Sequence, residues 1–310
     1  MARRQYVYLL TLALGSAGGA RAQAVERAVA FTFDDLPVAR FSSLSDVHAI
    51  TTRLLGHIRT QRIPAIGFVN EVKLEGPPHE REGRVALLQA WLDQGLELGN
   101  HTYSHMRLYD ASLEAFQADV LRGERVTSRL MSARGGRPRF FRHPTLNTGR
   151  DLETKAAFER FLTEHGYTVA PVTIDNDDYL YALAYDRARA RSDTSAMRRL
   201  GQDYVRYIGE IFGHFEALSR TLLGREPPQV LLLHANALNA DYLDELASMI
   251  AARGYALVSL ERALQDPAYR LPDRYIGARG PSWLERWATT QGVDPGLQPP
   301  IPDWVQTATR

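Results

Sequence analysis

The stretch Ala30-Phe31-Thr32-Phe33-Asp34-Asp35 decides how the rest of the sequence is interpreted. An apolar run typical of a buried strand ends there in two adjacent carboxylates, and Pro37 follows shortly after. Charged groups are costly to place at the end of a buried strand, and carboxylates in that position commonly act as metal ligands or general bases. Two adjacent aspartates also occur in ordinary turns, so a functional role for them depends on which residues follow the other predicted strands.

Similar short apolar runs recur along the chain, and segments with helical periodicity separate most of them. The runs are 29–33, 65–69, 96–99, 140–141, 168–174, 230–233 and 256–259, and the helical segments are 45–61, 84–94, 112–132, 150–165, a long stretch within 181–223, and 240–252. Such alternation predicts an α/β fold with a parallel sheet. Seven repeats predict a closed or nearly closed (β/α)7-type barrel in a single domain. The alternative is an open doubly wound sheet.

Polar side chains suited to a reactive site follow six of the seven runs. In chain order they are Asp34 and Asp35; Asn70; Asn100, His101 and His105; Arg142 and His143; Asp175, Asp177 and Asp178; and His234 and Asn236. Residues at the carboxyl ends of parallel strands meet at one face of an α/β barrel, where the active sites of such barrels lie. The sequence therefore predicts one site assembled from several strands.

The N-terminus has the pattern of a secretory signal peptide. Arg3 and Arg4 precede a short apolar run over 6–14, and two cleavage sites follow, Ala20-Arg21-Ala22 and Ala22-Gln23-Ala24. This pattern predicts a signal peptide over residues 1–22, or 1–24 with the second site, and an exported protein, periplasmic or secreted. The run is too short for an ordinary membrane span, so no stable span is expected after the signal is removed. An uncleaved N-terminal anchor is the alternative.

Composition restricts the remaining possibilities. The 310 residues have a formal net charge of +1 and no basic stripe, so a nucleic-acid partner is not expected. The chain has no cysteine, so any metal must be held by nitrogen and oxygen ligands. Residues 25–265 are expected to form the catalytic barrel, with a helical insertion at about 180–225. Residues 266–310 are expected to wrap around it, with Trp283 and Trp287 on one face of a short helix.

His101 and His105 are candidate metal ligands. If a helix begins at His101, imidazoles four residues apart lie on one face, where a single ion can bind both. Two histidines and one carboxylate leave coordination positions open, as a catalytic ion requires. The alternative is that these histidines cap or solvate the start of a helix.

At this point the sequence resembles the polysaccharide deacetylase family, the NodB-like carbohydrate esterases of family four, over about residues 29–264. The motifs that carry the resemblance are Thr32-Phe33-Asp34-Asp35, His101-Thr102-Tyr103-Ser104-His105, Phe141-Arg142-His143-Pro144, Asp175-Asn176-Asp177-Asp178-Tyr179 and Leu231-Leu232-Leu233-His234. Five ordered motifs make the resemblance specific. It implies a distorted barrel that holds a divalent metal, usually zinc, with cobalt, nickel or manganese as alternatives. It also implies a hydrolase that removes N- or O-linked acetyl groups from sugars.

The resemblance also implies a role for each matching residue. Asp35, His101 and His105 would hold the ion, which would activate water. Asp34 would be the general base, and His234, across the barrel mouth, the general acid. Arg142 would orient Asp34, and Asp178 would orient His234. The expected partner is an acetylated glycan, and no protein partner is predicted.

The chain departs from the family pattern where the sugar would bind. Leu36 replaces a glycine, Thr145 an aromatic residue and Tyr179 a tryptophan. Two other functions therefore stay open: hydrolysis of a non-glycan amide or small acylated compound, and glycan binding without catalysis. The intact Asp34 and His234 argue against the second. Six residues are candidate substrate contacts: Asn70, His143, Pro144, Thr145, Asp175 and Tyr179. Asn70 could equally be a strand-end amide whose hydrogen bonds are satisfied within the protein.

Overall fold

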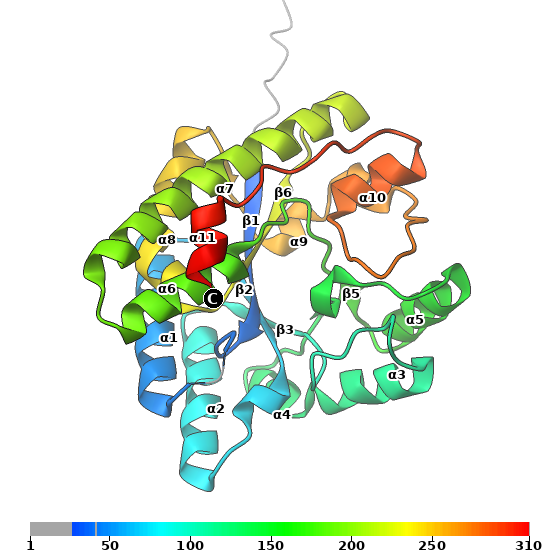
Figure 1. Cartoon of the computed structure of the whole chain (residues 1–310). Coiled ribbons are helices and arrows are strands. Elements are labelled where there is room, and N and C mark those ends of the chain that lie inside the picture. The colour runs from blue at the N-terminus through cyan, green and yellow to red at the C-terminus, as the bar shows by residue number, and fades with distance from the viewer. Residues whose placement is uncertain (1–26, 41, 310) are drawn as a thin grey trace, which may run out of the picture.

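The computed structural model describes residues 27–40 and 42–309, and its centre is a curled parallel sheet surrounded by helices (Figure 1). The expected signal peptide lies outside the described residues. The seven strands are β1 (Ala28–Leu36), β2 (Ile66–Val69), β3 (Glu97–Asn100), β4 (Phe140–Phe141), β5 (Thr168–Val169), β6 (Gln229–His234) and β7 (Ala256–Leu257). All seven were predicted from the sequence, each within a few residues of its observed bounds.

The order of the strands across the sheet is β5-β4-β3-β2-β1-β6, and β7 pairs with the start of β1. After β5 the chain continues to Ile174, which forms a parallel bridge with Leu231 of β6. The amide of Ile174 donates to the carbonyl of Val230 at 3.0 Å, and the amide of Leu232 donates to the carbonyl of Ile174 at 3.1 Å. These bonds connect the two ends of the sheet, so the predicted distorted barrel is confirmed.

The helices cover the outside of the sheet. They are α1 (Leu44–Thr60), α2 (Pro78–Asp93), α3 (Leu113–Arg122), α4 (Arg125–Ser132), α5 (Leu152–Glu164), α6 (Asp178–Ala190), α7 (Thr194–Leu223), α8 (Ala237–Ala252), α9 (Leu260–Ala263), α10 (Trp283–Thr290) and α11 (Asp303–Ala308). Three short 3₁₀ helices, η1 (Glu71–Leu74), η2 (Pro144–Leu146) and η3 (Pro267–Arg270), lie in the connections. Figure 1 shows α1, α6, α7 and α8 packed together on one side, and α3 beside α5 on the other.

The single helix expected over 112–132 is wrong, because the structure divides it into α3 and α4 at Gly123. A Cβ atom at Gly123 would lie 2.4 Å from the backbone of both Thr102 and Tyr103. The absence of a side chain therefore lets the loop after β3 pack directly against this break, and that loop carries both candidate histidine ligands.

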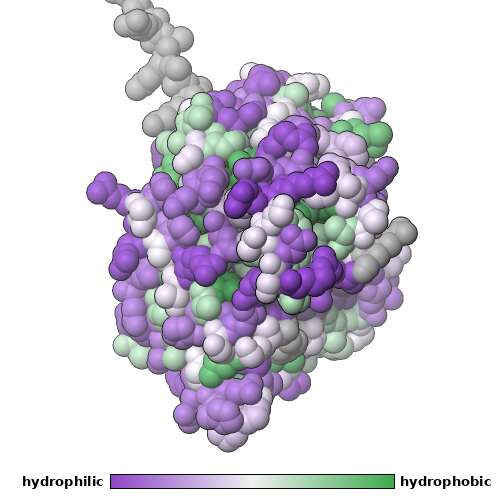
Figure 2. Space-filling view, turned by 60° about the vertical axis from the view of Figure 1, so that its left-hand side comes forward, coloured by the Kyte–Doolittle hydropathy of each residue, from purple (hydrophilic) through white to green (hydrophobic). Residues whose placement is uncertain are grey.

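Hydrophobic residues fill the space between the sheet and its helices. The strand β1 is buried along almost its whole length, and the amphipathic face of α7 buries two tyrosines and several aliphatic and phenylalanine side chains against α6, α8 and α10. Trp283 and Trp287 of α10 are both buried. The face shown in Figure 2 is mostly hydrophilic, with hydrophobic residues in small separate patches. Within the described residues, no helix combines the length and the apolar character needed to cross a bilayer.

Candidate functional site

Side chains from four strand ends and the segment after β5 converge at the carboxyl edge of the sheet. Strands β1 and β6 are neighbours there, and Asp34 and His234 are partners in their register. The expectation that His234 lies across the barrel mouth from Asp34 is therefore wrong. Because partners on adjacent parallel strands project to the same face, the two side chains reach the site next to each other.

Asp35, His101 and His105 form a compact group of potential metal ligands. One ligand atom from each residue lies within 4.8 Å of the others. The Asp35 Oδ1 atom is 3.8 Å from His101 Nε2 and 3.7 Å from His105 Nε2. This oxygen is buried and has no hydrogen-bond partner, which is unusual for a buried carboxylate. A carboxylate oxygen without a partner and two imidazole nitrogens fit a divalent ion that accepts nitrogen and oxygen ligands.

His101 is held in the form that metal binding requires. Its ring is buried, and its Nδ1 atom lies 2.8 Å from the carbonyl oxygen of Arg142. Burial, with a further contribution from His105, lowers the pKa of His101 well below its ordinary value, so the ring is neutral. When Nδ1 donates to the carbonyl, the lone pair of Nε2 faces the two aspartates, which is the usual arrangement of a histidine ligand.

The two histidines lie on a loop, so the condition considered from the sequence, a helix that begins at His101, is not met. Thr102 and His105 have positive φ angles of 65° and 62°, which no α-helix contains. The side chain of Asn100 accepts from the amide of Thr102 at 2.8 Å, and the hydroxyl of Thr102 accepts from the amide of His105 at 3.0 Å. These local bonds, rather than helical spacing, bring the two imidazoles together.

Asn70 supports this loop from behind and does not line the cavity. Its side chain is buried, and its amide donates to the carbonyl oxygens of His101 and Thr102. The structure therefore does not bring Asn70 to the substrate side. Its amide nitrogen is satisfied within the protein, as expected for a strand-end amide, whereas its Oδ1 atom is buried without a hydrogen-bond partner. The physical reason is that the backbone of the ligand loop has carbonyl groups that need donors within the protein.

Lys73 is a charged neighbour of the site that the motifs did not indicate. Its ammonium group lies 3.4 Å from Asp35 Oδ2 and donates to the carbonyl of Ala39 at 2.7 Å. Burial alone would raise the pKa of Asp35, but Lys73 and the nearby imidazoles outweigh it and lower this pKa to about 2. Asp35 is therefore ionised at neutral pH even without a cation in the site.

Asp34 and Arg142 form a buried pair beside the metal group. Arg142 Nη1 lies 3.3 Å from both carboxylate oxygens of Asp34, and both side chains are almost completely buried. Arg142 is fixed further by Nε, which donates to the carbonyl of Ala170 at 2.8 Å, and by Nη2, which donates to the hydroxyl of Thr32 at 2.9 Å. Burial raises the pKa of Asp34 to about 6, although Arg142 and His234 oppose this rise. A carboxylate with a raised pKa is a more effective proton acceptor near neutral pH.

His234 and Asp178 form a second pair. The Nδ1 atom of His234 lies 2.6 Å from Asp178 Oδ1, and the backbone amide of His234 donates to Asp178 Oδ2 at 2.9 Å. Asp178 is fully buried, and Asn239 donates to its Oδ2 at 2.7 Å. Burial lowers the pKa of His234, but the carboxylates, Asp178 first among them, outweigh this and raise it to about 10. The ring is therefore protonated at neutral pH, with Nε2 as its remaining proton donor.

The cavity beside these groups has a volume of about 510 Å³. Among the predicted residues, it is lined by Asp34, Asp35, His101, His105, Thr145, Asp175, Asp177, Tyr179 and His234. Arg40, Leu183, Leu232 and Gly280 also line it and were not predicted. Arg40, Leu183 and Gly280 lie outside the motifs that resemble the family, and Leu232 is an apolar strand residue, so the sequence contained no sign of their position.

His143 and Pro144 do not line this cavity. The ring of His143 is buried between Phe141 and Phe158, with centroid distances of 5.1 Å and 5.4 Å. Burial lowers its pKa well below the ordinary value, so it is neutral. The structure therefore does not bring His143 to the substrate rim, because its side chain packs into the aromatic cluster behind the loop, and Pro144 is buried with it.

Unusual backbone conformations concentrate around the cavity. Within the described residues, seven residues other than glycine have positive φ angles, and five of them lie at the site: Asp35, Thr102, His105, Thr145 and Leu146. Such conformations cost free energy and persist where the surrounding structure enforces them, often at functional sites. These backbone conformations are an observation separate from the sequence motifs, and they indicate the same functional site.

Comparison with known proteins adds three observations. The profile of a family described as polysaccharide deacetylase matches residues 21–169. A peptidoglycan-N-acetylglucosamine deacetylase of Bacillus cereus is 25% identical over 151 residues, which cover 49% of this chain and 46% of that protein. The chain thus matches only about half the length of this curated relative.

The solved structures that resemble this one include two mutants of BA3943, which is described as a CE4 family pseudoenzyme and comes from Bacillus anthracis. One mutant has a TM-score of 0.51 and 16% identity, and the other, described as having restored enzymatic activity, has a TM-score of 0.50 and 15% identity. Each comparison covers 77% of this chain and 68% of the other. At this level of identity the likeness concerns the fold alone.

Proposed function

Because residues 21–169 belong to the polysaccharide deacetylase family, we propose that the protein is a metal-dependent hydrolase that removes acetyl groups from a carbohydrate. The observation that carries the proposal is that one cavity is lined by the Asp35, His101 and His105 group together with Asp34 and His234, each of which is paired with a buried partner behind it, Arg142 and Asp178. A barrel that only bound glycans would have no chemical need for a buried base beside a protonated imidazole.

Hydrolysis of an amide or ester requires a nucleophilic water, a polarised carbonyl and a protonated leaving group. Asp35, His101 and His105 would hold a divalent ion, which when bound would polarise the acetyl carbonyl and lower the pKa of water. The donor atoms suit zinc, and cobalt, nickel or manganese could take its place.

The protein's own residues would carry the protons. Asp34 accepts a proton from the attacking water, and Arg142 keeps its carboxylate in position. His234 Nε2 donates a proton to the departing nitrogen or oxygen, while Asp178 fixes the ring through Nδ1 and stabilises its charge. Thr145, Asp175 and Tyr179, which line the cavity, would contact the sugar.

The relative that acts on peptidoglycan N-acetylglucosamine makes N-acetylated hexosamines the first substrates to test. Acetate released from N-acetylglucosamine oligomers and from 4-nitrophenyl acetate would be measured with and without added zinc. Acetate release that depends on the metal supports the proposal. Release from neither substrate under any metal condition would contradict it. Release from small amides or esters but no glycan would favour hydrolysis of a non-glycan compound, which the departures at Thr145 and Tyr179 keep open.

We also propose that the protein acts outside the cytoplasm. The proposal is supported by the signal-peptide pattern over residues 1–22 and by the kind of substrate that the Bacillus cereus relative is named for. N-terminal sequencing of protein recovered from the periplasm or the medium tests it. A chain that still begins at Met1 in the membrane fraction would favour the anchor instead.

Replacement of His234 by alanine is expected to lower turnover by an amount that depends on the leaving group of the substrate. The loss of the proton donor should lower turnover of an N-acetyl sugar by about 10²–10⁴-fold, the usual contribution of a general acid. A 4-nitrophenyl ester should lose far less, because its phenolate departs without a proton. Turnover of both substrates would be measured with metal content in parallel. Equal losses on the two substrates would show that His234 does not act as the acid.

Replacement of Asp178 by asparagine is expected to change the dependence of activity on pH. Asp178 contributes most to raising the pKa of His234, and His234 must be protonated to donate. Activity of the parent protein should therefore fall only as the pH rises towards about 10, and in Asp178→Asn this fall should begin at lower pH. The measurement is kcat/KM against pH, and the acidic limb serves as the internal reference. An alkaline limb that does not move would contradict the assigned coupling.

A further inference from the structure

Lysine is rare in this chain, and its two occurrences have similar surroundings. Of the 37 lysine and arginine residues, only Lys73 and Lys155 are lysines. Both are buried, and the ammonium group of each lies beside an aspartate, which is Asp35 for the first and Asp273 for the second. Arginine occupies all the other positions, so the use of a compact ammonium group at these two requires a physical explanation.

Each of these aspartates divides its two carboxylate oxygens between different partners. Lys155 Nζ lies 2.5 Å from Asp273 Oδ2, and Asp273 Oδ1 accepts from the amide of Tyr275 at 3.0 Å. Lys73 Nζ lies 3.4 Å from Asp35 Oδ2, but Asp35 Oδ1 is buried and has no hydrogen-bond partner. The partner that a backbone amide provides at Asp273 is therefore missing at Asp35, where the free oxygen faces the two histidine ligands.

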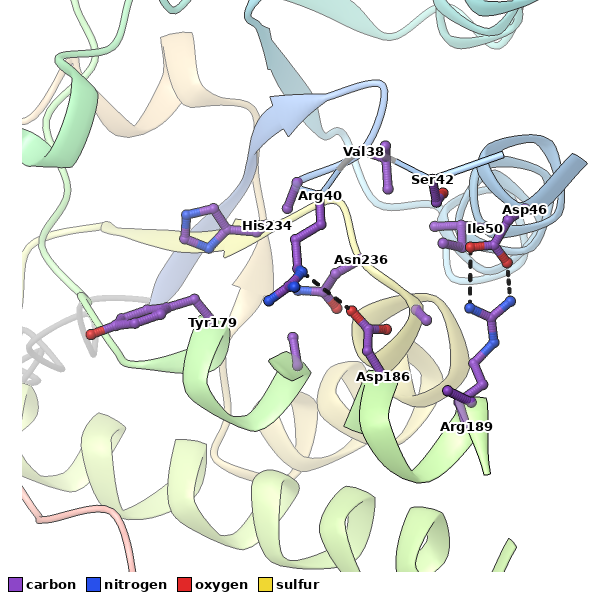
Figure 3. A pocket seen from close by; sticks show the side chains of 14 residues that line it. Val38, Arg40, Ser42, Asp46, Ile50, Tyr179, Asp186, Arg189, His234 and Asn236 are labelled. Carbon is purple, nitrogen blue, oxygen red and sulfur yellow. Dashed lines mark hydrogen bonds and ion pairs between the residues drawn. The ribbon is translucent and has the colours of Figure 1, made fainter. Parts of the chain in front are cut away.

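The other contacts of Lys73 keep its ammonium group on the Oδ2 side. An ammonium group has three protons to donate, and Lys73 donates to the carbonyl of Val38 at 3.2 Å and to that of Ala39 at 2.7 Å. Both carbonyls belong to the loop after β1, from which Arg40 extends towards Asp186 (Figure 3). With two protons used by the loop, Lys73 has one left for Asp35.

Arginine side chains in this protein contact carboxylates differently. Arg225 donates to both oxygens of Asp266, at 2.8 Å and 2.6 Å, and Arg142 Nη1 lies 3.3 Å from both oxygens of Asp34. A guanidinium group is planar and has a fixed fork of donors that matches a carboxylate, whereas an ammonium group acts as a point charge. An arginine in place of Lys73 would therefore compete for the oxygen that faces the histidines.

We propose that Lys73 is a positioning residue, which holds Asp35 through Oδ2 and leaves Oδ1 as the single oxygen that binds the divalent ion. The proposal rests on the proposed function and adds to it a residue outside the motifs. The positive charge of Lys73 also opposes that of the ion, so the site should bind metal less tightly than the same three ligands without it. Because Lys73 draws charge from Asp35, the ligand neutralises less of the ion's charge, which polarises the acetyl carbonyl.

Two substitutions of Lys73 should shift the affinity for zinc in opposite directions. Lys73→Gln removes the charge but keeps a donor for the loop carbonyls, and it leaves Asp35 uncompensated, so zinc should bind about tenfold or more tightly. Lys73→Arg keeps the charge but engages both oxygens of Asp35, so zinc should bind about 10–100-fold more weakly. Affinity would be measured by competition with a chelator. Weaker binding in both variants would indicate a structural role only, and unchanged binding would indicate none, so either result would overturn the proposal.

The matched control is Lys155→Gln, which removes the other buried lysine from its aspartate. Neither Lys155 nor Asp273 lines the cavity over the catalytic groups, so the affinity for zinc should not change. Thermal unfolding of all three variants would show how far each is destabilised. In cobalt-loaded protein, the visible absorption spectrum reports the ligands of the ion. The spectrum should change in Lys73→Arg and stay the same in Lys155→Gln, and a Lys73→Arg spectrum identical to that of the parent would contradict the assignment.

Turnover provides a further measurement. Lys73 does not line the cavity, so Lys73→Gln should lower kcat by about tenfold or more and leave KM nearly unchanged. A parent protein that binds no divalent ion would overturn both this role and the proposed function. A parent that binds zinc but releases no acetate would contradict the proposed function alone, because the affinity measurements need no turnover. A parent that binds zinc and releases acetate, with the same zinc affinity in both Lys73 variants, would overturn only the role of Lys73.

Discussion

Replacement of His101 by alanine is expected to abolish both metal binding and acetate release. His101 supplies one of the three donor atoms that lie within 4.8 Å of one another, and its ring is already oriented by the carbonyl of Arg142. Changing a group that merely orients a metal ligand costs about 10–100-fold in affinity or activity, so loss of the ligand itself should cost more. Zinc affinity would be measured by competition with a chelator, together with acetate release.

The matched control for this prediction is His79→Ala. His79 is exposed on α2 and belongs to no cluster of potential ligands among the described residues, so its loss should change neither quantity. Chelation of the parent protein should remove activity, and added zinc should restore it. Full activity after thorough chelation, or an unchanged zinc affinity in His101→Ala, would contradict the assignment.

Replacement of Asp34 by asparagine is expected to lower turnover by about 10²–10⁴-fold, the usual contribution of a general base. Asparagine has nearly the same shape, but it cannot accept the proton of the attacking water. The metal should stay bound, because Asp35 rather than Asp34 belongs to the ligand group. The measurement is kcat on an N-acetylglucosamine oligomer, with the zinc content of the same sample.

The Asp34→Asn variant also needs a check of stability, since it leaves the buried charge of Arg142 without its carboxylate. Breaking a buried ion pair typically costs about 3–5 kcal/mol. Thermal unfolding would therefore be compared with that of Asp93→Asn, which alters an exposed carboxylate. If a folded, zinc-loaded Asp34→Asn protein had a turnover within tenfold of the parent, Asp34 would not be the general base.

The sequence predicted the barrel well because its strands are short apolar runs with helices between them. Strand order and the closing bridge at Ile174 depend on pairing between distant segments, and no local pattern encodes them. The break at Gly123 was missed for a similar reason. The periodicity of residues 112–132 is helical on both sides of Gly123. Only the loop at Thr102 and Tyr103, which packs against Gly123, shows why the helix must stop there.

The candidate site was predictable where its residues directly follow strands. Residues after parallel strands meet at one edge of the sheet, and this placed Asp34, Asp35 and His234 there. The position after a strand does not determine which way a side chain turns. Asn70 and His143 both follow strands, yet one supports a backbone loop and the other packs among phenylalanines. Lys73 reaches the site from η1 and Arg40 from the loop after β1, and neither belongs to a motif, so only the folded chain reveals them.

The register between β1 and β6 has a consequence for how this protein can be altered. Asp34 and His234 are aligned by six successive pairs of residues, from Val29 and Gln229 onward. Deleting or inserting one residue within either strand would turn the side chains beyond it to the opposite face of the sheet. Base and acid would then no longer share a face, even if the barrel still folded. Engineering that changes chain length should therefore be confined to the connections, and these two strands should be treated as segments of constant length.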